Sequence, residues 1–274
     1  MVPEPKDPAS EGPEDEEEPE EEEPGEPASE GSGEAEAPPE EEEEEVPEFA
    51  DLPVPSLDEL RAALDWAFEG DELPDGYLDR CAEHAVLVQT ANRVMNLTKV
   101  VDPKEIAAKH YLDSWRAGTF LPLMGRSLLD LGSGGGYPGV PIALAEPNTK
   151  VVLCDSIQKK ADFLAESVAK MGLTNVSAIG DRAEEHLLRN QYDVVIVRAV
   201  SSVRENVRTL RKVRHSLRDL VMLKGPSWSR EVRAGEREAE RLGFKLETVW
   251  EHELPEGMGK RAILIYRAPG AQGA

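Results

Sequence analysis

The chain has 274 residues, and its 55 acidic and 31 basic side chains give a formal net charge of −24 at pH 7. The acidity is local, because residues 1–50 hold 23 Asp and Glu against one Lys, whereas the rest of the chain holds 32 acids and 30 bases. A uniformly acidic, salt-adapted protein is therefore excluded, and so is a membrane span, because no run of 18 apolar residues occurs.

Residues 1–50 consist almost entirely of Glu, Pro, Gly, Ser and Ala. Such a composition offers too little apolar surface to offset the entropy cost of ordering the backbone, so we expect a disordered acidic tail. Two interpretations of this tail stay open. It either solvates the protein or mimics a polyphosphate backbone and competes for a basic surface.

The sequence carries no signs of secretion or of a metal site. No basic segment followed by an apolar core opens the chain, so we expect a cytoplasmic protein that does not bind membranes. Cys81 and Cys154 form no Cys-x-x-Cys or Cys/His cluster, which argues against a disulfide framework and against bound metal. We expect two buried thiols and a monomeric chain.

Residues 51–126 have helical periodicity and predict a helical N-terminal segment that caps the substrate site. Ser56 followed by Glu59 has the spacing of a capping box, so a first helix is expected to begin there. Further helices are expected over residues 76–94 and 104–118.

From residue 127 the pattern changes to alternating strands and helices. Five apolar runs, each nearly continuous in Val, Ile and Leu, predict parallel strands covered on both faces: SLLDLG, KVVLCDS, VSAIGD, YDVVIVRA and LVMLKG. The last two runs, KLETVWEHEL and RAILIYRA, are separated by too few residues for a helical crossover and should pair antiparallel. The prediction over residues 127–268 is an α/β fold: a Rossmann-like, mostly parallel seven-stranded sheet with a C-terminal antiparallel hairpin, similar to class I S-adenosylmethionine-dependent methyltransferases. Residues 269–274 are expected to be flexible.

Five glycines lie within residues 132–139, directly after the first predicted strand. A P-loop is disfavoured, because Tyr137 and Pro138 stand where that loop needs Lys and Ser or Thr. The spacing of Gly134, Gly136 and Gly139 matches a dinucleotide-binding loop, so spacing leaves that alternative open.

Charge favours a cationic ligand over a phosphate at this loop. Asp130 precedes the first glycine by two residues, and two like charges at 4 Å repel by about 4 kcal/mol at an effective dielectric of 20. S-adenosylmethionine carries a sulfonium and an ammonium instead, and its methionine moiety needs the close backbone approach that Gly132 and Gly134 allow. The alternative is that Asp130 caps the following helix and that the loop is only a tight turn.

The residues after the other strands supply further candidate contacts, because ligands of open α/β sheets bind at the carboxyl ends of the strands. Asp155 can accept from both ribose hydroxyls, and Ala183 and Glu184 follow the third strand, where an adenine would lie. Arg198 ends the fourth strand, where a buried guanidinium is costly unless an anion pairs with it. The anion would be either the cofactor carboxylate or an RNA phosphate. A structural salt bridge of Arg198 is the alternative.

The absence of two sequence motifs narrows the choice of the atom that accepts the methyl group. The turn after the fourth strand reads VRAVSS, which lacks the Asn/Asp-Pro-Pro-aromatic pattern of amino-group methylation, and no cysteine is placed for attack at a pyrimidine. Guanine N7 already has a free lone pair, so it needs alignment rather than a base. We therefore expect no catalytic residue, with His110 as the best-placed histidine.

Two basic clusters are candidates for RNA contact. Arg204, Arg208 and Arg211 have the spacing of one helix face, with three further basic residues nearby, Lys212, Arg214 and Arg218. The second cluster should lie near the mouth of the site: Lys99, Lys104, Lys109, Arg116 and Arg126. A solvated face is the alternative for the first cluster.

Over residues 78–268 the chain resembles the family of ribosomal small-subunit RNA guanine-N7 methyltransferases, also called glucose-inhibited division protein B. The resemblance rests on N-L-T at Asn96–Thr98, D-P at Asp102–Pro103, K-H-x-L-D-S at Lys109–Ser114, D-L-G-S-G-G-G-Y-P-G-V-P at Asp130–Pro141, D-S at Asp155–Ser156, K-K-x-x-F-L at Lys159–Leu164, R-A at Arg198–Ala199 and L-K-G at Leu223–Gly225. The acidic tail and the Arg-rich segment 201–219 depart from the family pattern.

The resemblance implies methyl transfer from S-adenosylmethionine to N7 of a guanine in 16S rRNA, with the small-subunit rRNA or the small ribosomal subunit as partner. It also implies five cofactor contacts, at Gly132, Tyr137, Ala183, Glu184 and Arg198. Two alternatives stay open: an NAD-dependent oxidoreductase, and a non-catalytic RNA-binding protein that retains the fold.

Overall fold

The computed structural model describes residues 51–269, and the expectations for residues 1–50 and 270–274 lie outside this range. The helices are α1 (Leu57–Ala67), α2 (Tyr77–Met95), α3 (Pro103–Ile106), the π-helix η1 (Ala107–Leu112), α4 (Asp113–Phe120), α5 (Gly139–Ala145), α6 (Gln158–Lys170), α7 (Ala183–Leu187), α8 (Val203–Thr209), the 3₁₀ turns η2 (Leu210–Lys212) and η3 (Pro255–Gly257), and α9 (Trp228–Leu242). The strands are β1 (Ser127–Leu131), β2 (Lys150–Asp155), β3 (Val176–Gly180), β4 (Tyr192–Arg198), β5 (Leu217–Lys224), β6 (Lys245–Glu253) and β7 (Lys260–Arg267).

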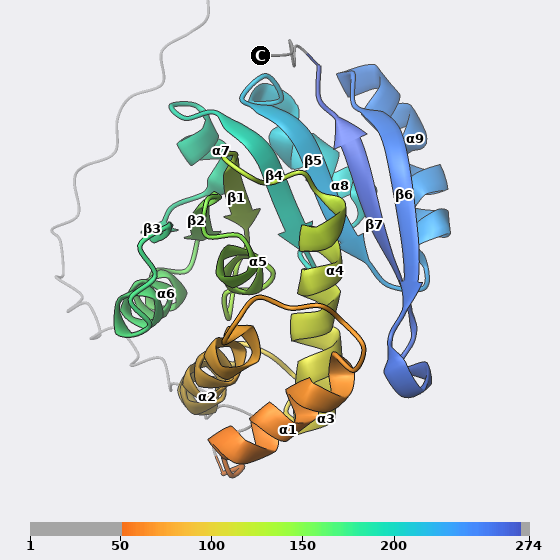
Figure 1. Cartoon of the computed structure of the whole chain (residues 1–274). Helices are drawn as coiled ribbons and strands as arrows, with labels where there is room; N and C mark the ends of the chain where they lie inside the picture. Colours follow the sequence, from red (N-terminus) through yellow and green to blue (C-terminus); the bar gives the residue numbers. More distant parts are fainter. Residues whose placement is uncertain (1–50, 270–274) are drawn as a thin grey trace, which may run out of the picture. The chain divides into compact units, whose positions relative to one another are not determined.

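The seven strands form one sheet in the order β3-β2-β1-β4-β5-β7-β6 (Figure 1). Strands β1 to β5 are parallel, and β7 runs antiparallel to both β5 and β6. The predicted doubly wound sheet with a reversed C-terminal hairpin is confirmed. The order reverses between β1 and β4, and such a switch point is where open α/β sheets bind ligands.

Neighbouring residues of each central strand point to opposite faces and so build two cores. Leu128 packs in a cluster with the N-terminal helices, α5 and α6, whereas Leu129 packs in a second cluster with α7, α8 and α9. Figure 1 shows α5 and α6 on one face of the sheet and α8 and α9 on the other. The continuous apolar runs of the sequence follow from this two-sided burial.

The helical segment begins as the sequence predicts. Ser56 Oγ accepts from Glu59 N at 3.2 Å, and a Glu59 carboxylate oxygen accepts from Ser56 N at 2.8 Å, which completes the capping box. Both cysteines are free and buried. Among residues 51–269, no helix combines the length and apolar composition needed to cross a membrane, and no cluster of His, Cys, Asp and Glu is arranged to hold a metal ion.

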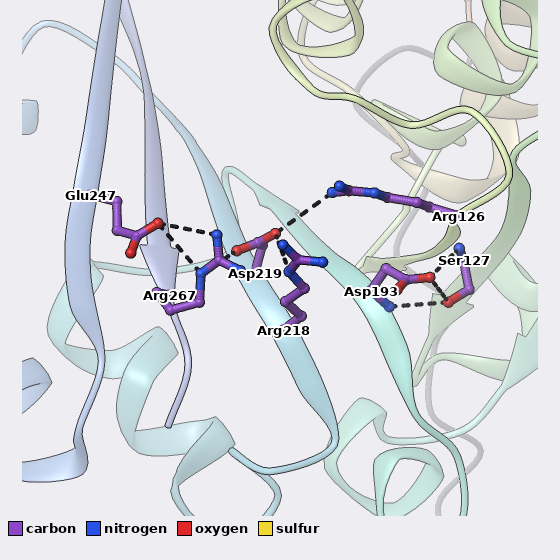
Figure 2. Close-up of polar contacts among 7 residues, drawn as sticks. All are labelled: Arg126, Ser127, Asp193, Arg218, Asp219, Glu247 and Arg267. Atoms are coloured by element: carbon purple, nitrogen blue, oxygen red, sulfur yellow. Dashed lines mark hydrogen bonds and ion pairs between the residues drawn. The ribbon is translucent and has the colours of Figure 1, made fainter. Parts of the chain in front are cut away.

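A group of charged residues joins the ends of the strands where β1, β4 and β5 begin and β7 ends, away from the glycine loop that follows β1 (Figure 2). Asp219, 5% exposed, lies within 3.9 Å of Arg126, 3.8 Å of Arg218 and 3.1 Å of Arg267. Beside them Asp193 Oδ2 accepts from the backbone and side chain of Ser127, both at 2.8 Å, and so ties the start of β4 to that of β1. Arg126 therefore lies away from the mouth of the site, and the prediction that placed it there is wrong.

Candidate functional site

The glycine loop bends back over the end of β2. Gly132, Gly134 and Gly136 have φ angles of +72°, +55° and +91°, a backbone conformation that residues with a side chain rarely adopt. The amide of Gly132 donates to the Cys154 carbonyl at 2.8 Å, and the amide of Gly134 donates to Asp155 Oδ2 at 3.0 Å. The loop is thus fixed to the neighbouring strand by its own backbone.

Asp155 holds the loop and still has capacity for a ligand. Its Oδ1 accepts from Ile157 N at 3.0 Å, so two of the roughly four lone-pair positions of the carboxylate are engaged. The structure therefore brings three of the expected contact residues together, Gly132, Gly134 and Asp155, at the carboxyl ends of β1 and β2.

Asp130 plays the role that the sequence left as the alternative. It is 0% exposed, and its Oδ2 accepts from Gly139 N at 2.8 Å, so it caps α5 rather than facing a ligand. Its Oδ1 is buried without a hydrogen-bond partner in the described part of the chain. Burial raises its pKa to about 7, although the bond from Gly139 and the charge of Arg198 act in the opposite direction.

The site nevertheless keeps an acidic character, because Asp155 ends β2, and Asp181 and Glu184 follow β3, near the buried thiol of Cys154. Burial is the main cause that raises the pKa of this thiol to about 12, and the charges of Asp181, Asp155, Asp130 and Glu184 raise it further. These carboxylates gather at the ends of β1, β2 and β3. A phosphate would be repelled there, whereas a cation would be stabilised.

Ala183 and Glu184 open α7, just after β3. Ala183 is buried in the second core cluster with Cys154, and its side chain is 6% exposed. Glu184 lines a hollow of about 520 Å³ that also involves Leu188, Arg208 and Lys212. Both residues thus lie just after the carboxyl end of β3, where the sequence predicted the adenine. Glu184 lines the hollow together with Arg208 of α8.

Tyr137 and Arg198, far apart in the sequence, meet above the sheet. The guanidinium carbon of Arg198 lies 5.1 Å from the centre of the Tyr137 ring, and the His110 ring stacks on the same tyrosine at 4.5 Å. Arg198 Nη1 donates to the Lys109 carbonyl and to His110 Nδ1, both at 2.9 Å. No ion pair within 4 Å involves Arg198 in the described residues, so the structural salt bridge considered for it is not formed.

His110 is held as a neutral ring. Because Nδ1 accepts from Arg198, the ring proton is on Nε2, which donates to Thr98 Oγ1 at 2.9 Å. Burial, together with the charge of Arg198, lowers its pKa well below the usual value. With both nitrogens engaged, His110 orients Arg198 instead of acting as a base.

A buried hydroxyl chain behind the loop was missed by the sequence analysis. The Tyr137 hydroxyl donates to the Tyr111 hydroxyl at 2.9 Å, which in turn contacts His84 Nδ1 at 2.9 Å. Tyr111 is 0% exposed and belongs to η1, a helix type that often occurs at functional sites. Its only sequence signal was its position inside the K-H-x-L-D-S segment.

Replacing Tyr111 with phenylalanine is expected to lower the free energy of unfolding by about 1–3 kcal/mol, because the Tyr137 hydroxyl and His84 Nδ1 lose a buried partner. Urea unfolding of the full chain measures this. The matched control is Tyr266→Phe, since the Tyr266 hydroxyl is buried without a partner in the described residues and its removal should cost nothing. Equal losses in the two variants would contradict the role of the chain.

Two exposed aliphatic side chains flank the loop and were also missed. Ile157, just past β2, is 51% exposed, and Val200, just past β4, is 47% exposed. A Cβ added to Gly132 would lie 2.7 Å from Val200 Cγ2, so the loop and Val200 are in close proximity. Apolar side chains exposed at a binding edge suit the flat face of a ligand ring.

A cavity of about 480 Å³ opens beside the loop, between η1, α4 and the ends of β4 and β5. Val200 lines it and so connects it to the loop. Four cations, Lys109, Arg198, Lys224 and Arg261, and two carboxylates, Asp113 and Glu231, contribute to its wall. The sequence did not indicate this cavity, because its residues come from six segments that are separate in the chain.

The structure changes the interpretation of the predicted basic clusters. Lys104, Lys109 and Arg116 pair with Glu256, Glu105 and Asp71 at 3.0, 2.6 and 2.6 Å. The helix that was expected to carry the arginines ends at Thr209 and continues as a 3₁₀ turn, so Arg211 leaves the face, and Arg208 pairs with Glu238 at 3.1 Å. Each cluster is thus partly neutralised, whereas Lys99, Arg204 and Lys212 are exposed and form no ion pair within 4 Å in the described residues.

A doubly wound sheet with a reversed hairpin, whose carboxyl edge joins a glycine loop, an acidic wall and an adjacent cavity, defines a Rossmann-like methyltransferase. The sequence model of the family described as rRNA small subunit methyltransferase G matches residues 78–257, and the chain belongs to this family. It is therefore a member of an enzyme family that methylates small-subunit rRNA.

Relatives with the same description occur in distant bacteria. The ribosomal RNA small subunit methyltransferase G of Solibacter usitatus is 36% identical over 199 residues, which cover 70% of this chain and 91% of the relative. That of Carboxydothermus hydrogenoformans is 32% identical over 185 residues, covering 66% of this chain and 79% of the relative. Among solved structures, a SAM dependent methyltransferase from Aquifex aeolicus is similar with a TM-score of 0.46 and 19% identity, covering 63% of this chain and 97% of that one.

Proposed function

We propose that this chain transfers a methyl group from S-adenosylmethionine to N7 of a guanine in small-subunit rRNA. The observation that carries the proposal is the junction of the glycine loop, held by Asp155, with a cavity in which Arg198 forms no ion pair with any described residue. Residues 127–268 are assigned to the donor and residues 51–126 to a cap over the acceptor.

The residues at the loop fit this cofactor. Gly132 and Gly134 allow close approach of the methionine moiety, and the free capacity of Asp155 suits the ribose hydroxyls. Ile157, Ala183 and Glu184 are assigned to the adenine, whereas Tyr137 and Arg198 border the methionine end. When bound, S-adenosylmethionine supplies an electrophilic methyl group on a cationic sulfur, and the carboxylates around Cys154 complement that charge.

The residues on the side of the methyl acceptor favour a ring nitrogen as the acceptor atom. Such an atom has its own lone pair, so the protein has to align it and exclude water rather than remove a proton. His110, which lines the cavity, has both nitrogens engaged and a lowered pKa, so it offers no base. The role of this chain is thus orientation, with Arg198 fixed by His110 and the Lys109 carbonyl.

The test uses the full chain with methyl-labelled cofactor and small ribosomal subunits from a strain that lacks this gene. We expect label in a single nucleotide that digestion and mass spectrometry identify as 7-methylguanosine. Deproteinised RNA assayed in parallel shows whether the assembled particle is required. Label on an exocyclic amine would contradict the proposal.

Two rival functions give different results in the same series. An NAD-dependent oxidoreductase would be stabilised thermally by NAD and not by S-adenosylhomocysteine, the reverse of what we expect. A non-catalytic RNA-binding protein would bind S-adenosylhomocysteine but leave every RNA unlabelled.

A further inference from the structure

The cavity beside the glycine loop contains an opposite-charge pair that is held apart. Arg198 and Asp113 both line it; burial lowers the pKa of the Arg198 guanidinium, and the charge of Asp113 is the strongest of the charges that oppose this effect. In the described part of the chain the two side chains form no ion pair within 4 Å. Each is instead fixed by a separate neighbour.

These neighbours leave one face of each group for a ligand. Arg198 uses Nη1 for the Lys109 carbonyl and His110. Asp113, 4% exposed, accepts from His252 Nε2 through Oδ1 at 3.1 Å, and no hydrogen bond to its Oδ2 is found within residues 51–269. A hydrogen-bond donor and an acceptor are thus both available in the wall of the cavity.

Of these two groups, Arg198 is the one that contacts the loop. Arg198 lies over the ring of Tyr137, which belongs to the loop, and Asp113 follows one turn after His110, the residue that holds Arg198. Asp113 forms no hydrogen bond or ion pair with residues 132–139 in the described part of the chain, so the guanidinium is the group of this pair that lies next to the loop.

Guanine presents atoms that match both groups. Its N7 is followed around the ring by the O6 acceptor, the N1–H donor and the 2-amino donor, whereas adenine places an amino donor at the O6 position and an acceptor at N1. With N7 toward the loop, O6 would meet Arg198, and N1–H and the 2-amino group would meet Asp113. With adenine, the amino donor would face the Arg198 donor and the N1 acceptor would face the Asp113 acceptor. Both pairs would leave buried polar groups without a hydrogen bond.

We propose that Asp113 determines the choice of guanine by accepting from N1–H and the 2-amino group, while Arg198 donates to O6. This inference rests on the proposed methyl transfer to guanine N7. Asp113 is thereby a specificity residue in contact with the substrate, and its bond to His252 uses only Oδ1, so Oδ2 is left for the base.

The test compares two acceptors that differ only at the 2-amino group. Small-subunit RNA is prepared with guanosine or inosine at the single nucleotide found to be methylated, and kcat/KM is measured for both. The wild-type chain should prefer guanosine by about tenfold or more, the effect of one hydrogen bond to a charged group. Asp113→Asn should reduce this preference to within about threefold, mainly through loss of activity on guanosine.

His252→Ala is the matched control, because it removes the partner of Asp113 and keeps the carboxylate. It should retain most of the preference for guanosine. Calorimetric binding of S-adenosylhomocysteine to all three proteins shows that each is folded with its donor site intact.

Three outcomes would overturn the inference: equal wild-type rates on guanosine and inosine, an equal loss on both acceptors in Asp113→Asn, or full reproduction of the Asp113→Asn pattern by His252→Ala. The first outcome is measured on the wild-type chain, so it tests the inference even if Asp113→Asn does not fold. Absence of wild-type transfer to any small-subunit RNA would instead refute the proposed function itself.

Discussion

Asp130→Asn is expected to make the protein more stable than the wild type at pH 8, by about 4 kcal/mol, and equally stable near pH 4. Burial raises the pKa of Asp130 to about 7 in the folded protein, against about 3.9 in an unfolded chain. A difference of about three pKa units at about 1.4 kcal/mol each gives this order of magnitude. The asparagine can still accept from Gly139 N, so the cap of α5 is kept.

The sign follows from proton binding. Between about pH 4 and pH 7 the folded protein holds a proton on Asp130 that the unfolded chain has lost, so wild-type stability falls as pH rises through this window and levels off above it. Asp130→Asn lacks this slope. Urea unfolding of both proteins at pH 5, 6, 7 and 8 measures the difference.

Asp193 is the matched control, because its pKa is shifted the other way. Burial acts to raise it, but the two hydrogen bonds from Ser127 lower it overall. Asp193→Asn should therefore reduce stability at pH 8. Parallel pH profiles for the wild type and Asp130→Asn would show that the Asp130 carboxylate is not held in the way described.

Gly132→Ala is expected to weaken binding of S-adenosylhomocysteine by about 100-fold, which corresponds to about 2.7 kcal/mol. Gly132 has φ +72°, and an added Cβ would lie 2.7 Å from Val200 Cγ2, so either the loop or Val200 must move at the junction with the cavity. The strained backbone should cost a further 1–2 kcal/mol or so of stability. Isothermal calorimetry and urea unfolding separate the two effects.

Gly172→Ala controls for backbone strain. Gly172, in the turn after α6, has φ +62°, and no atom of residues 51–269 lies within 4 Å of an added Cβ. It should lose similar stability and keep the wild-type affinity. A Gly132→Ala protein that binds as tightly as the Gly172→Ala protein would remove Gly132 from the donor site.

The arrangement of strands and the place of the loop could be predicted from the sequence alone. The apolar runs, the short final connection and the glycine cluster are local signals, and each depends on residues within one or two turns of the chain. The capping box at Ser56 and the parallel order of β1 to β5 were predicted for the same reason, and the structure confirms both.

The partners of the charged side chains were decided only by the tertiary structure. Asp113 meets His252, Lys104 meets Glu256 and Arg126 meets Asp219, pairs separated by roughly a hundred residues or more. The sequence therefore treated Lys104 and Arg126 as free bases and Asp130 as a ligand contact. Periodicity fixes which face of a strand or helix is buried, but a long polar side chain takes whichever partner the packed elements bring within hydrogen-bond distance, and that depends on the whole fold.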